Sequence, residues 1–216
     1  MNSHSYSDAE IAGVYRAIRE RRDVRHFKRG PLEDGQLQRF LEAAHHGPSV
    51  GYMQPWRFVR ITDAALRASI HQHVNEERIK TAEALGKRAD DFMKLKVEGI
   101  LECAEVLVVG LIDKRDQYVF GRRTMPEMDL ASAACALQNF WLAARAEGNG
   151  AGWVSMFDPQ RLREIVGMPE GSQPIAVLCV GQVHEFYTAP MLELEKWDQR
   201  RPLNDILFEN RWDQQA

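Results

Sequence analysis

The sequence lacks a long apolar run, a secretion signal and an excess of basic charge. Its longest apolar stretch, residues 104–112, is interrupted by Glu105 and is far too short to span a bilayer. The polar residues 1–8 lack the apolar segment of a signal peptide. A net charge of −3 provides no overall basic field that would attract nucleic acid or anionic lipid. We therefore expect a soluble, cytoplasmic protein with neither nucleic-acid nor membrane partners.

Cysteine is also scarce, with three widely spaced residues in apolar runs: Cys103, Cys135 and Cys179. This distribution predicts buried, reduced thiols instead of a disulfide framework. His45 and His46 are adjacent, and His71 and His73 would diverge on a helix. No cysteine or acidic residue recurs at ligand spacing, so we expect no metal site. The nucleophile elbow of serine hydrolases is absent as well.

The length of 216 residues favours one domain, residues 1–216, with a sizeable core. Helical spacing predicts a first helix beginning near Ser7 and Asp8, a second around residues 37–44, and a short one from Asp158. Four strands are expected, at residues 56–61, 104–112, 151–157 and 174–183. Helices combined with a few strands indicate an α+β domain.

Three further segments have distinctive patterns. Residues 63–101 are charged and helical with a thin hydrophobic face, which favours a lid or peripheral excursion over a core helix. Thr124 and Glu127 have capping-box spacing before a long helix that ends at Glu147. Its small residues, 131–136, suit the centre of the core or a dimer interface. The tail, about residues 187–216, contains aromatic and leucine side chains that are costly to expose, so we expect it to wrap over a body or a partner subunit.

The first helix runs into Arg-Arg-Asp-Val-Arg at residues 21–25. Taken alone, such a charge run is more often a solvated surface than a site. However, Arg21 and Arg25 are four residues apart, so a helical continuation would place both on one side, and paired guanidinium forks suit a phosphate. Asp23 between them is an unexpected choice for phosphate binding alone.

Two glycine-containing segments are candidates for contact with a flat ligand. Residues 47–56 form either a plain turn or a shaped loop in which Gln54, Met53 and Trp56 recognise a heterocycle. Residues 148–153 are not a dinucleotide motif, because they follow a helix and open a strand. Their glycines instead favour a helix cap and close approach of the backbone to a flat ligand, and Ser155 follows on the same strand face as Trp153.

Together these pieces resemble the nitroreductase family of FMN enzymes over nearly the whole chain. The matching motifs are Arg-Arg-x-x-Arg at residues 21–25, Pro-Ser-x-x-x-x-Gln-Pro-Trp at 48–56, the helix from Asp129 to Gly148 leading into Gly152-Trp153, and Arg200-x-Pro202. The resemblance implies a nitroreductase-like fold: a central mixed β-sheet surrounded by helices, with a lid segment and an extended C-terminal tail. It also implies a homodimer with FMN at the subunit interface.

Within that family the chain is most similar to the 5,6-dimethylbenzimidazole synthase branch. Asp23 stands where typical members have serine, and residues 51–53 replace a stretch that usually contains asparagine. The resemblance implies an oxidoreductase that fragments reduced FMN with molecular oxygen to the lower ligand of cobalamin, and a separate flavin reductase that supplies reduced FMN. It also implies a set of FMN-binding residues: Arg21, Arg22, Asp23, Val24, Arg25, Ser49, Val97, Ser155 and Arg200. Asp23 and Ser155 are the implied catalytic residues.

Asp23 has a physical reason to act in such a reaction. Fragmentation of a flavin requires repeated proton transfer, for which a carboxylate is a far better base than a serine hydroxyl at neutral pH. Ser155 is better suited to orienting a group by hydrogen bonding, because no base that would make it a nucleophile is visible. Two rival hypotheses are an NAD(P)H-dependent FMN nitroreductase and a non-catalytic flavin carrier. A flavin carrier that catalyses no reaction has no evident need for the Asp23 carboxylate.

Overall fold

The computed structural model describes residues 4–212. Two short ranges lie outside the described residues: residues 1–3, which begin the polar N-terminus, and residues 213–216, which end the predicted tail. The described chain divides between Phe186 and Tyr187 into two compact units. The first unit contains the β-sheet and six α-helices, with bounds given below. The described part of the second unit contains one short α-helix and a 3-10 helix at Leu203–Asp205.

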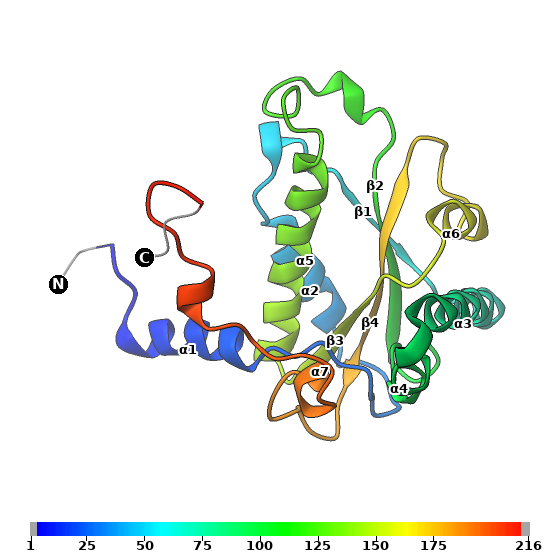
Figure 1. Cartoon of the computed structure of the whole chain (residues 1–216). Helices are drawn as coiled ribbons and strands as arrows, with labels where there is room; N and C mark the ends of the chain where they lie inside the picture. The colour runs from blue at the N-terminus through cyan, green and yellow to red at the C-terminus, as the bar shows by residue number, and fades with distance from the viewer. Residues whose placement is uncertain (1–3, 213–216) are drawn as a thin grey trace. The chain divides into compact units, whose positions relative to one another are not determined.

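Four antiparallel strands form the sheet in the order β1-β2-β4-β3 (Figure 1). Their bounds are β1 Trp56–Arg60, β2 Glu105–Leu111, β3 Asn149–Val154 and β4 Gln173–Gln182. All four strands predicted from the sequence are therefore present. β3 ends three residues earlier than expected, because the chain leaves the sheet so that Asp158 can accept a hydrogen bond from the amide of Arg161 at the start of a helix.

One face of the sheet packs against α2 (Gln36–His45) and α5 (Met128–Ala146). Phe40 of α2 and Phe140 of α5 meet edge to face with ring centroids 5.6 Å apart. Leu107 and Val109 of β2 point to this face, as the period of two along a strand requires. These buried side chains form the larger of two hydrophobic clusters.

The opposite face packs against α3 (Ala64–Leu85) and α6 (Pro159–Ile165), and α4 (Ala89–Lys94) adjoins α3. Ile70 and Val74 of α3 are completely buried against Val106 and Val108 of β2 in the second cluster. The expected helical character is found over residues 64–94 but not over residues 95–101. The first half of α3 belongs to the core, which the thin hydrophobic face of this segment did not predict.

The first helix, α1 (Asp8–Glu20), has no buried residue. Its N-terminus is closed by a capping box, in which the amide of Ser7 donates to the Glu10 carboxylate at 2.9 Å. Arg145 of α5 fixes its other end by donating to the carbonyl of Glu20 at 3.2 Å. Three apolar side chains on α1 are about half exposed: Val14, Tyr15 and Ile18.

The N-terminus of α5 differs from its prediction. The helix begins after Glu127 without a side-chain cap, so the capping box at Thr124 and Glu127 is wrong. The first amides are satisfied otherwise: that of Met128 donates to the carbonyl of Met125, and that of Leu130 to the Asp129 carboxylate.

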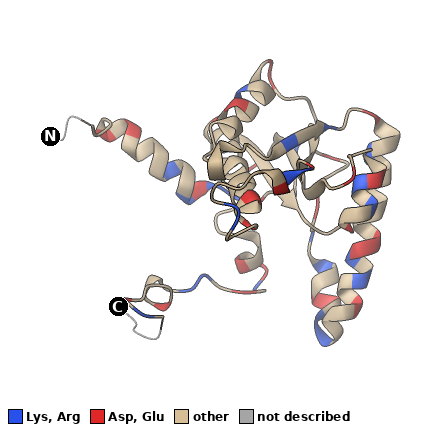
Figure 2. Ribbon diagram, turned by 90° about the horizontal axis from the view of Figure 1, so that it is seen from above, with Lys and Arg blue, Asp and Glu red and all other residues tan. Residues whose placement is uncertain are grey.

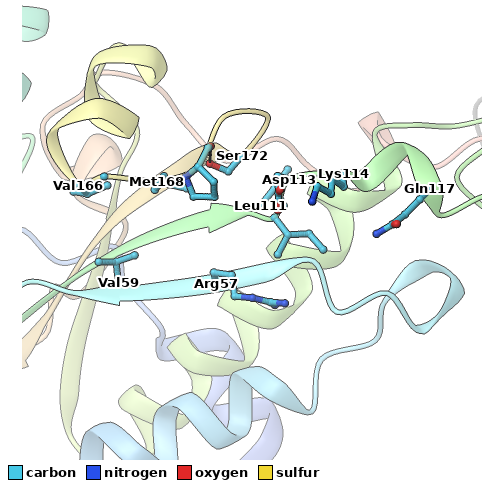
Figure 3. Close-up of a pocket in the computed structure, with 12 residues that line it drawn as sticks. Arg57, Val59, Leu111, Asp113, Lys114, Gln117, Val166, Met168 and Ser172 are labelled. Atoms are coloured by element: carbon cyan, nitrogen blue, oxygen red, sulfur yellow. Dashed lines mark hydrogen bonds between the residues drawn. The ribbon is translucent and has the colours of Figure 1, made fainter.

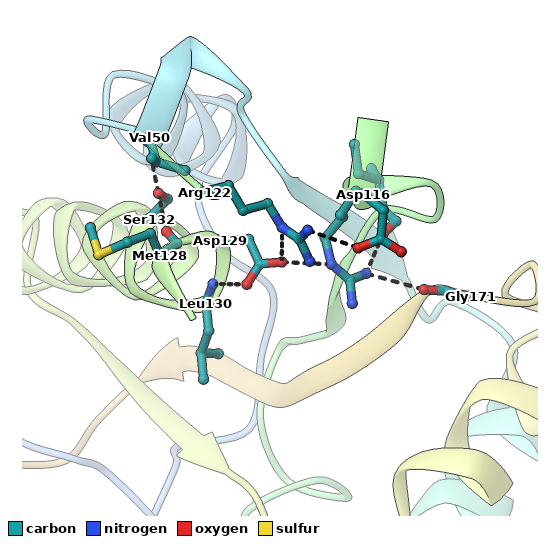
Figure 4. A network of polar contacts seen from close by, with 10 residues as sticks. Val50, Asp116, Arg122, Met128, Asp129, Leu130, Ser132 and Gly171 are labelled. Carbon is teal, nitrogen blue, oxygen red and sulfur yellow. Dashed lines mark hydrogen bonds and ion pairs between the residues drawn. The ribbon is translucent and has the colours of Figure 1, made fainter. Parts of the chain in front are cut away.

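Asp129 is buried at this end of α5 and pairs with two arginines (Figure 4). Its Oδ2 accepts from Nε of Arg115 at 2.8 Å and from Nε of Arg122 at 3.2 Å. Arg122 also pairs with the exposed Asp116 at 2.8 Å. The network ties the loop between β2 and α5 to the helix.

Cys103 and Cys179 are buried, but Cys135 is exposed, which corrects the prediction of three buried thiols. Residue 135 lies on the outer side of α5, because the buried face is formed by Ala133, Ala136 and Phe140. The outer side combines Cys135 with other small or apolar residues, so α5 has both a core face and an exposed face of the kind expected for an interface.

The second unit contains α7 (Met191–Leu194). Within it, the rings of Phe208 and Trp212 stack with centroids 5.6 Å apart, and Trp212 is 87% exposed. Arg200 is exposed.

Across residues 4–212, no helix has the length and apolarity needed to cross a bilayer, and no three potential metal-ligating side chains gather in one place. Charges of both signs are interspersed along the helices (Figure 2).

Candidate functional site

Residues 21–25 leave α1 in an extended conformation and join the edge of the sheet. Arg21 is already outside the helix, and Asp23 forms a parallel bridge with Ala151 of β3. The amide of Val24 donates to the carbonyl of Ala151 at 3.0 Å. The chain therefore does not continue as a helix through residues 21–25, but alternation along an extended chain still places Asp23 and Arg25 on one side.

The close approach of this segment to β3 depends on Gly152. A Cβ atom on residue 152 would lie 2.1 Å from the carbonyl oxygen of Val24 and 2.6 Å from Nη1 of Arg25. The missing side chain thus makes room for the chain's own backbone. This corrects the expectation that Gly152 admits a flat ligand, because Val24 and Arg25 fill that space.

Asp23 is held by one side chain and one backbone group. Its two carboxylate oxygens accept from Nη1 and Nη2 of Arg25 at 2.8 and 2.6 Å, a bidentate pair. The amide of Trp153 donates to the same carboxylate at 2.9 Å. Arg25 is nearly buried and also donates to the carbonyl of Trp153 at 2.8 Å. The carboxylate therefore has a fixed orientation at the sheet edge.

The pKa of Asp23 is raised above its ordinary value. Removal of water by the surrounding protein has the largest effect, and it exceeds the opposing influence of the positive charge of Arg25 and the amide of Trp153. The Asp23 side chain remains 45% exposed, so solvent screening limits the rise. The result is an accessible carboxylate that is easier to protonate than an ordinary aspartate.

Trp141 of α5 fixes the two arginines at the start of the segment, and sequence reasoning missed it. Its indole Nε1 donates to the carbonyls of Arg22 and Ala151 at 3.0 and 2.7 Å. The Arg21 guanidinium lies 4.6 Å from the Trp141 ring centroid, a cation–π contact. Four residues further along α5, Arg145 binds Glu20 at the end of α1, so one face of α5 contacts both the arginine segment and the helix before it.

Arg22 caps the end of α1. Its Nη1 donates to the carbonyls of Arg19 and Arg21 at 2.7 and 2.9 Å. Val24, by contrast, is buried in the second hydrophobic cluster. The arginine segment thus contains residues with clear structural roles beside the accessible Asp23.

Two other predicted residues belong to segments next to residues 21–25. Ser155 is exposed and directly follows β3, two positions after the residue whose amide binds Asp23. Val97 is half-buried in the chain after α4. That chain reaches Arg25 at Gly99, where a Cβ atom would lie 2.8 Å from the Arg25 carbonyl oxygen.

Ser49 lies elsewhere on the first unit. Its hydroxyl accepts from the amide of Gln54 at 3.1 Å, and the next amide, of Val50, donates to Ser132 near the start of α5. Ser132 and Trp141 are nine positions apart (141 − 132) on α5, which corresponds to a rise of about 13.5 Å. The structure therefore does not bring Ser49 to the arginine segment within one chain.

The loop that contains Ser49 offers less ligand surface than expected. Met53 and Trp56 are both buried, and the Trp56 indole donates to Nδ1 of His45 at 3.4 Å. The expectation that these two side chains face a heterocycle is wrong, because both are packed inside the protein. The loop is shaped by left-handed backbone at Tyr52 and Gln54, with φ of 55° and 50°.

Comparison with known proteins assigns the chain to one family. The sequence matches the model described as the nitroreductase family over residues 18–182. The matched range covers the sheet, α5 and residues 21–25. The chain belongs to the nitroreductase family.

Among its relatives, a protein from Rhodospirillum rubrum named 5,6-dimethylbenzimidazole synthase is 40% identical over 185 residues, covering 84% of this chain and 87% of that protein. A second protein with that name, from Rhodobacter capsulatus, is 33% identical over 189 residues, covering 86% of this chain and 90% of the relative. The resemblance to the synthase branch of the family is therefore shown.

Solved structures agree on the fold. A BluB-like flavoprotein from Clostridium difficile superposes with a TM-score of 0.69 at 19% identity, covering 90% of this chain and 97% of its own. Iodotyrosine deiodinase bound to FMN and 3-iodo-L-tyrosine has a TM-score of 0.73 at 20% identity, covering 92% of this chain and 100% of its own. The predicted α+β nitroreductase-like fold is confirmed.

Proposed function

We propose that this protein is a 5,6-dimethylbenzimidazole synthase, which consumes reduced FMN and molecular oxygen. Relatives at 40% and 33% identity, aligned over 87% and 90% of their length, carry this name and support the reaction. The structural observation on which the proposal rests is Asp23, an accessible carboxylate fixed beside the arginines by Arg25 and the Trp153 amide. A conventional nitroreductase would not need an acid at this position.

The chemistry of the donor set fits FMN. Three guanidinium groups within five residues suit a phosphate and the polar edge of a flavin ring. We assign FMN contacts to Arg21, Arg22, Asp23, Val24, Arg25 and Ser155, with Ser49, Val97 and Arg200 contributing from other segments. Because Arg25 already forms the bidentate pair with Asp23, we expect Arg21 and Arg22 to contribute more to the phosphate.

In this proposal Asp23 moves protons and Ser155 orients a reacting group. Reduced FMN, as substrate, supplies the ring atoms of the product. The raised pKa of Asp23 brings the carboxyl closer to the operating pH, where one group can both accept and release a proton. Ser155 has no neighbouring base that an observed contact identifies, so we assign it hydrogen bonding alone.

We further propose that the enzyme is a cytoplasmic homodimer with the flavin at the subunit interface, and that a separate flavin reductase supplies reduced FMN. The separation of Ser49 from residues 21–25 along α5 supports a shared site, since a second copy would bring another Ser49 loop. In the same scheme residues 63–101 carry a lid and residues 187–216 wrap over the partner.

The decisive experiment gives purified protein chemically reduced FMN and air, and detects 5,6-dimethylbenzimidazole by chromatography and mass spectrometry. We expect product with the wild-type protein and loss of product, but not of flavin binding, with Asp23→Asn. The matched control is Asp34→Asn, a change at an exposed acid outside the site. Return of oxidised FMN alone would contradict the proposal, and NAD(P)H oxidation would then favour the nitroreductase.

A further inference from the structure

A cavity of about 340 Å³ lies at the edge of the sheet opposite to β3 and the arginine segment. Its floor is made by Val59 of β1 and Leu111 of β2, and its wall by the chain between α6 and β4. The volume falls within the ~300–1,000 Å³ range of small-molecule sites. None of the residues assigned to FMN lines it.

An irregularity in the sheet lies beside the cavity. The register of β2 and β4 shifts between Val109 and Gly110, a bulge that bends the strand locally. A Cβ atom on residue 110 would lie 2.2 Å from Cε of Met168, so the missing side chain lets Met168 fold over the strand as one wall of the cavity. Such a bulge, combined with a glycine, is a device that shapes sites in β-sheets.

The cavity has an apolar end and a charged end. In Figure 3, Val59, Val166 and Met168 lie toward one end, while Arg57 and Lys114 lie toward the other. The apolar end offers only hydrocarbon and thioether surface. A ligand must therefore combine a hydrocarbon body with a group that suits the cations.

The two cations have no carboxylate partner. Within residues 4–212 neither Arg57 nor Lys114 forms an ion pair, and Nη1 of Arg57 donates only to the carbonyls of Gln54 and Trp56. Asp113 is the one carboxylate among the lining residues. Two positive groups and one negative group leave a single positive charge at this end, which matches a monoanion.

The backbone at the charged end is strained. Lys114 has φ of 52°, in the left-handed region that a lysine seldom occupies. Such conformations persist where the surrounding structure enforces them, and they cluster at ligand clamps. Here the strained residue is also one of the two cations.

We propose that this cavity binds a small amphipathic monocarboxylate. The carboxylate lies between Arg57 and Lys114, and the hydrocarbon body packs on Val59, Val166 and Met168. The site is independent of the proposed reaction with FMN, so neither result decides the other.

The test uses 2-naphthoate as the probe and the uncharged 2-naphthamide as its isostere. Binding is followed in the full-length protein by the NMR signal of the Met168 methyl group, which reports on the cavity directly. We expect a saturable shift with naphthoate and at least about fivefold weaker binding of naphthamide, as for loss of a charge-assisted contact. The proposal would be overturned if the two probes bound equally well, or if millimolar naphthoate gave no saturable shift. It would also be overturned if inorganic phosphate, which has no hydrocarbon body, displaced naphthoate from the cavity.

Lys114→Gly removes the charge and also relieves the left-handed strain, so weaker binding cannot be attributed to a damaged fold. We expect at least about fivefold weaker binding of naphthoate. Lys196→Gly is a matched control, because Lys196 has φ of 56° and does not line the cavity. Unchanged affinity in Lys114→Gly, or an equal loss in both variants, would exclude the proposed site.

Discussion

Asp23 combines two properties that usually oppose each other, a bidentate guanidinium partner and a raised pKa. We expect the carboxyl to titrate above the ordinary aspartate value of about 4. Since its folded pKa is raised, the stabilising effect of its protonated form is present at low pH and is lost as the pH rises through that pKa. Carboxyl ¹³C NMR of the flavin-free protein, with Asp23→Asn to assign the signal, measures this directly. A pKa at or below the ordinary value would be evidence against desolvation as the largest effect.

Gly152 is the residue on which the position of the arginine segment depends. Gly152→Ala would place a methyl group 2.1 Å from the Val24 carbonyl oxygen, so either the strand or the segment must move. We expect a loss of about 3 kcal/mol in the free energy of unfolding, the upper end for overpacking, and weaker flavin binding. Denaturant unfolding and flavin fluorescence measure the two effects.

The control for that change is Gly13→Ala, in the middle of α1. Apart from the backbone of α1 itself, no atom lies within 4 Å of the added Cβ, and a helix interior favours alanine over glycine by about 1 kcal/mol. This variant should be as stable as wild type or more stable. Equal destabilisation of both variants would refute the role assigned to Gly152.

At the residue scale, the sequence predicts best what depends on neighbours in the chain. The arginines and Asp23 lie within five positions, and their motif is recognisable locally. Trp141 escaped prediction because its hydrogen bond to Arg22 joins residues 119 positions apart. Met53 and Trp56 were misjudged because an aromatic or thioether side chain in a loop has the same pattern whether it faces a ligand or the core.

At the scale of elements, the N-terminus of α5 has no side-chain cap and is stabilised instead by the ion pairs of Asp129. Asp129 has 7% side-chain exposure, and its partners Arg115 and Arg122 have 14% and 13%. Asp129→Asn would leave two poorly hydrated guanidinium groups without their shared anion. We expect a loss of about 2–4 kcal/mol in the free energy of unfolding. Thermal and denaturant unfolding provide the measurement.

Asp116 offers the matched comparison, since it pairs with the same Arg122 but its side chain is 96% exposed. Asp116→Asn should leave the midpoint of unfolding almost unchanged, because exposed pairs contribute little. If the two variants were equally destabilised, burial would not explain the importance of Asp129.

The elements themselves were predicted well where periodicity is strong and poorly where local chemistry is ambiguous. All four strands and the long α5 follow from their hydrophobic patterns. The capping box before α5 was wrong, because turns formed by residues 125–130 satisfy the same amides with backbone and Asp129 acceptors. The burial of α3 was underestimated, since Ile70 and Val74 occupy only one helical turn of a charged helix.

At the scale of the whole molecule, the exposed face of α5 is the surface where we expect the second subunit. Cys135→Arg places a charge there, and two-fold symmetry brings that charge into the interface twice. We expect the dimer dissociation constant to rise at least about hundredfold. Analytical ultracentrifugation measures it, with Gln72→Arg on α3, across the sheet, as the control. A Cys135→Arg protein that stays dimeric would assign the interface to another surface.

The unburied helix α1 has a kinetic consequence. A helix of 13 residues is marginal in water unless an apolar face is covered, and α1 covers none of its residues fully. If the subunits associate over Val14, Tyr15 and Ile18, formation of α1 is coupled to dimerisation. The amide protons of α1 would then exchange with deuterated solvent rapidly in dilute protein and slowly in concentrated protein. Arg22 would then lose its contact with the Arg19 carbonyl of α1 in dilute protein, whereas Arg25 would keep its pair with Asp23 within one chain.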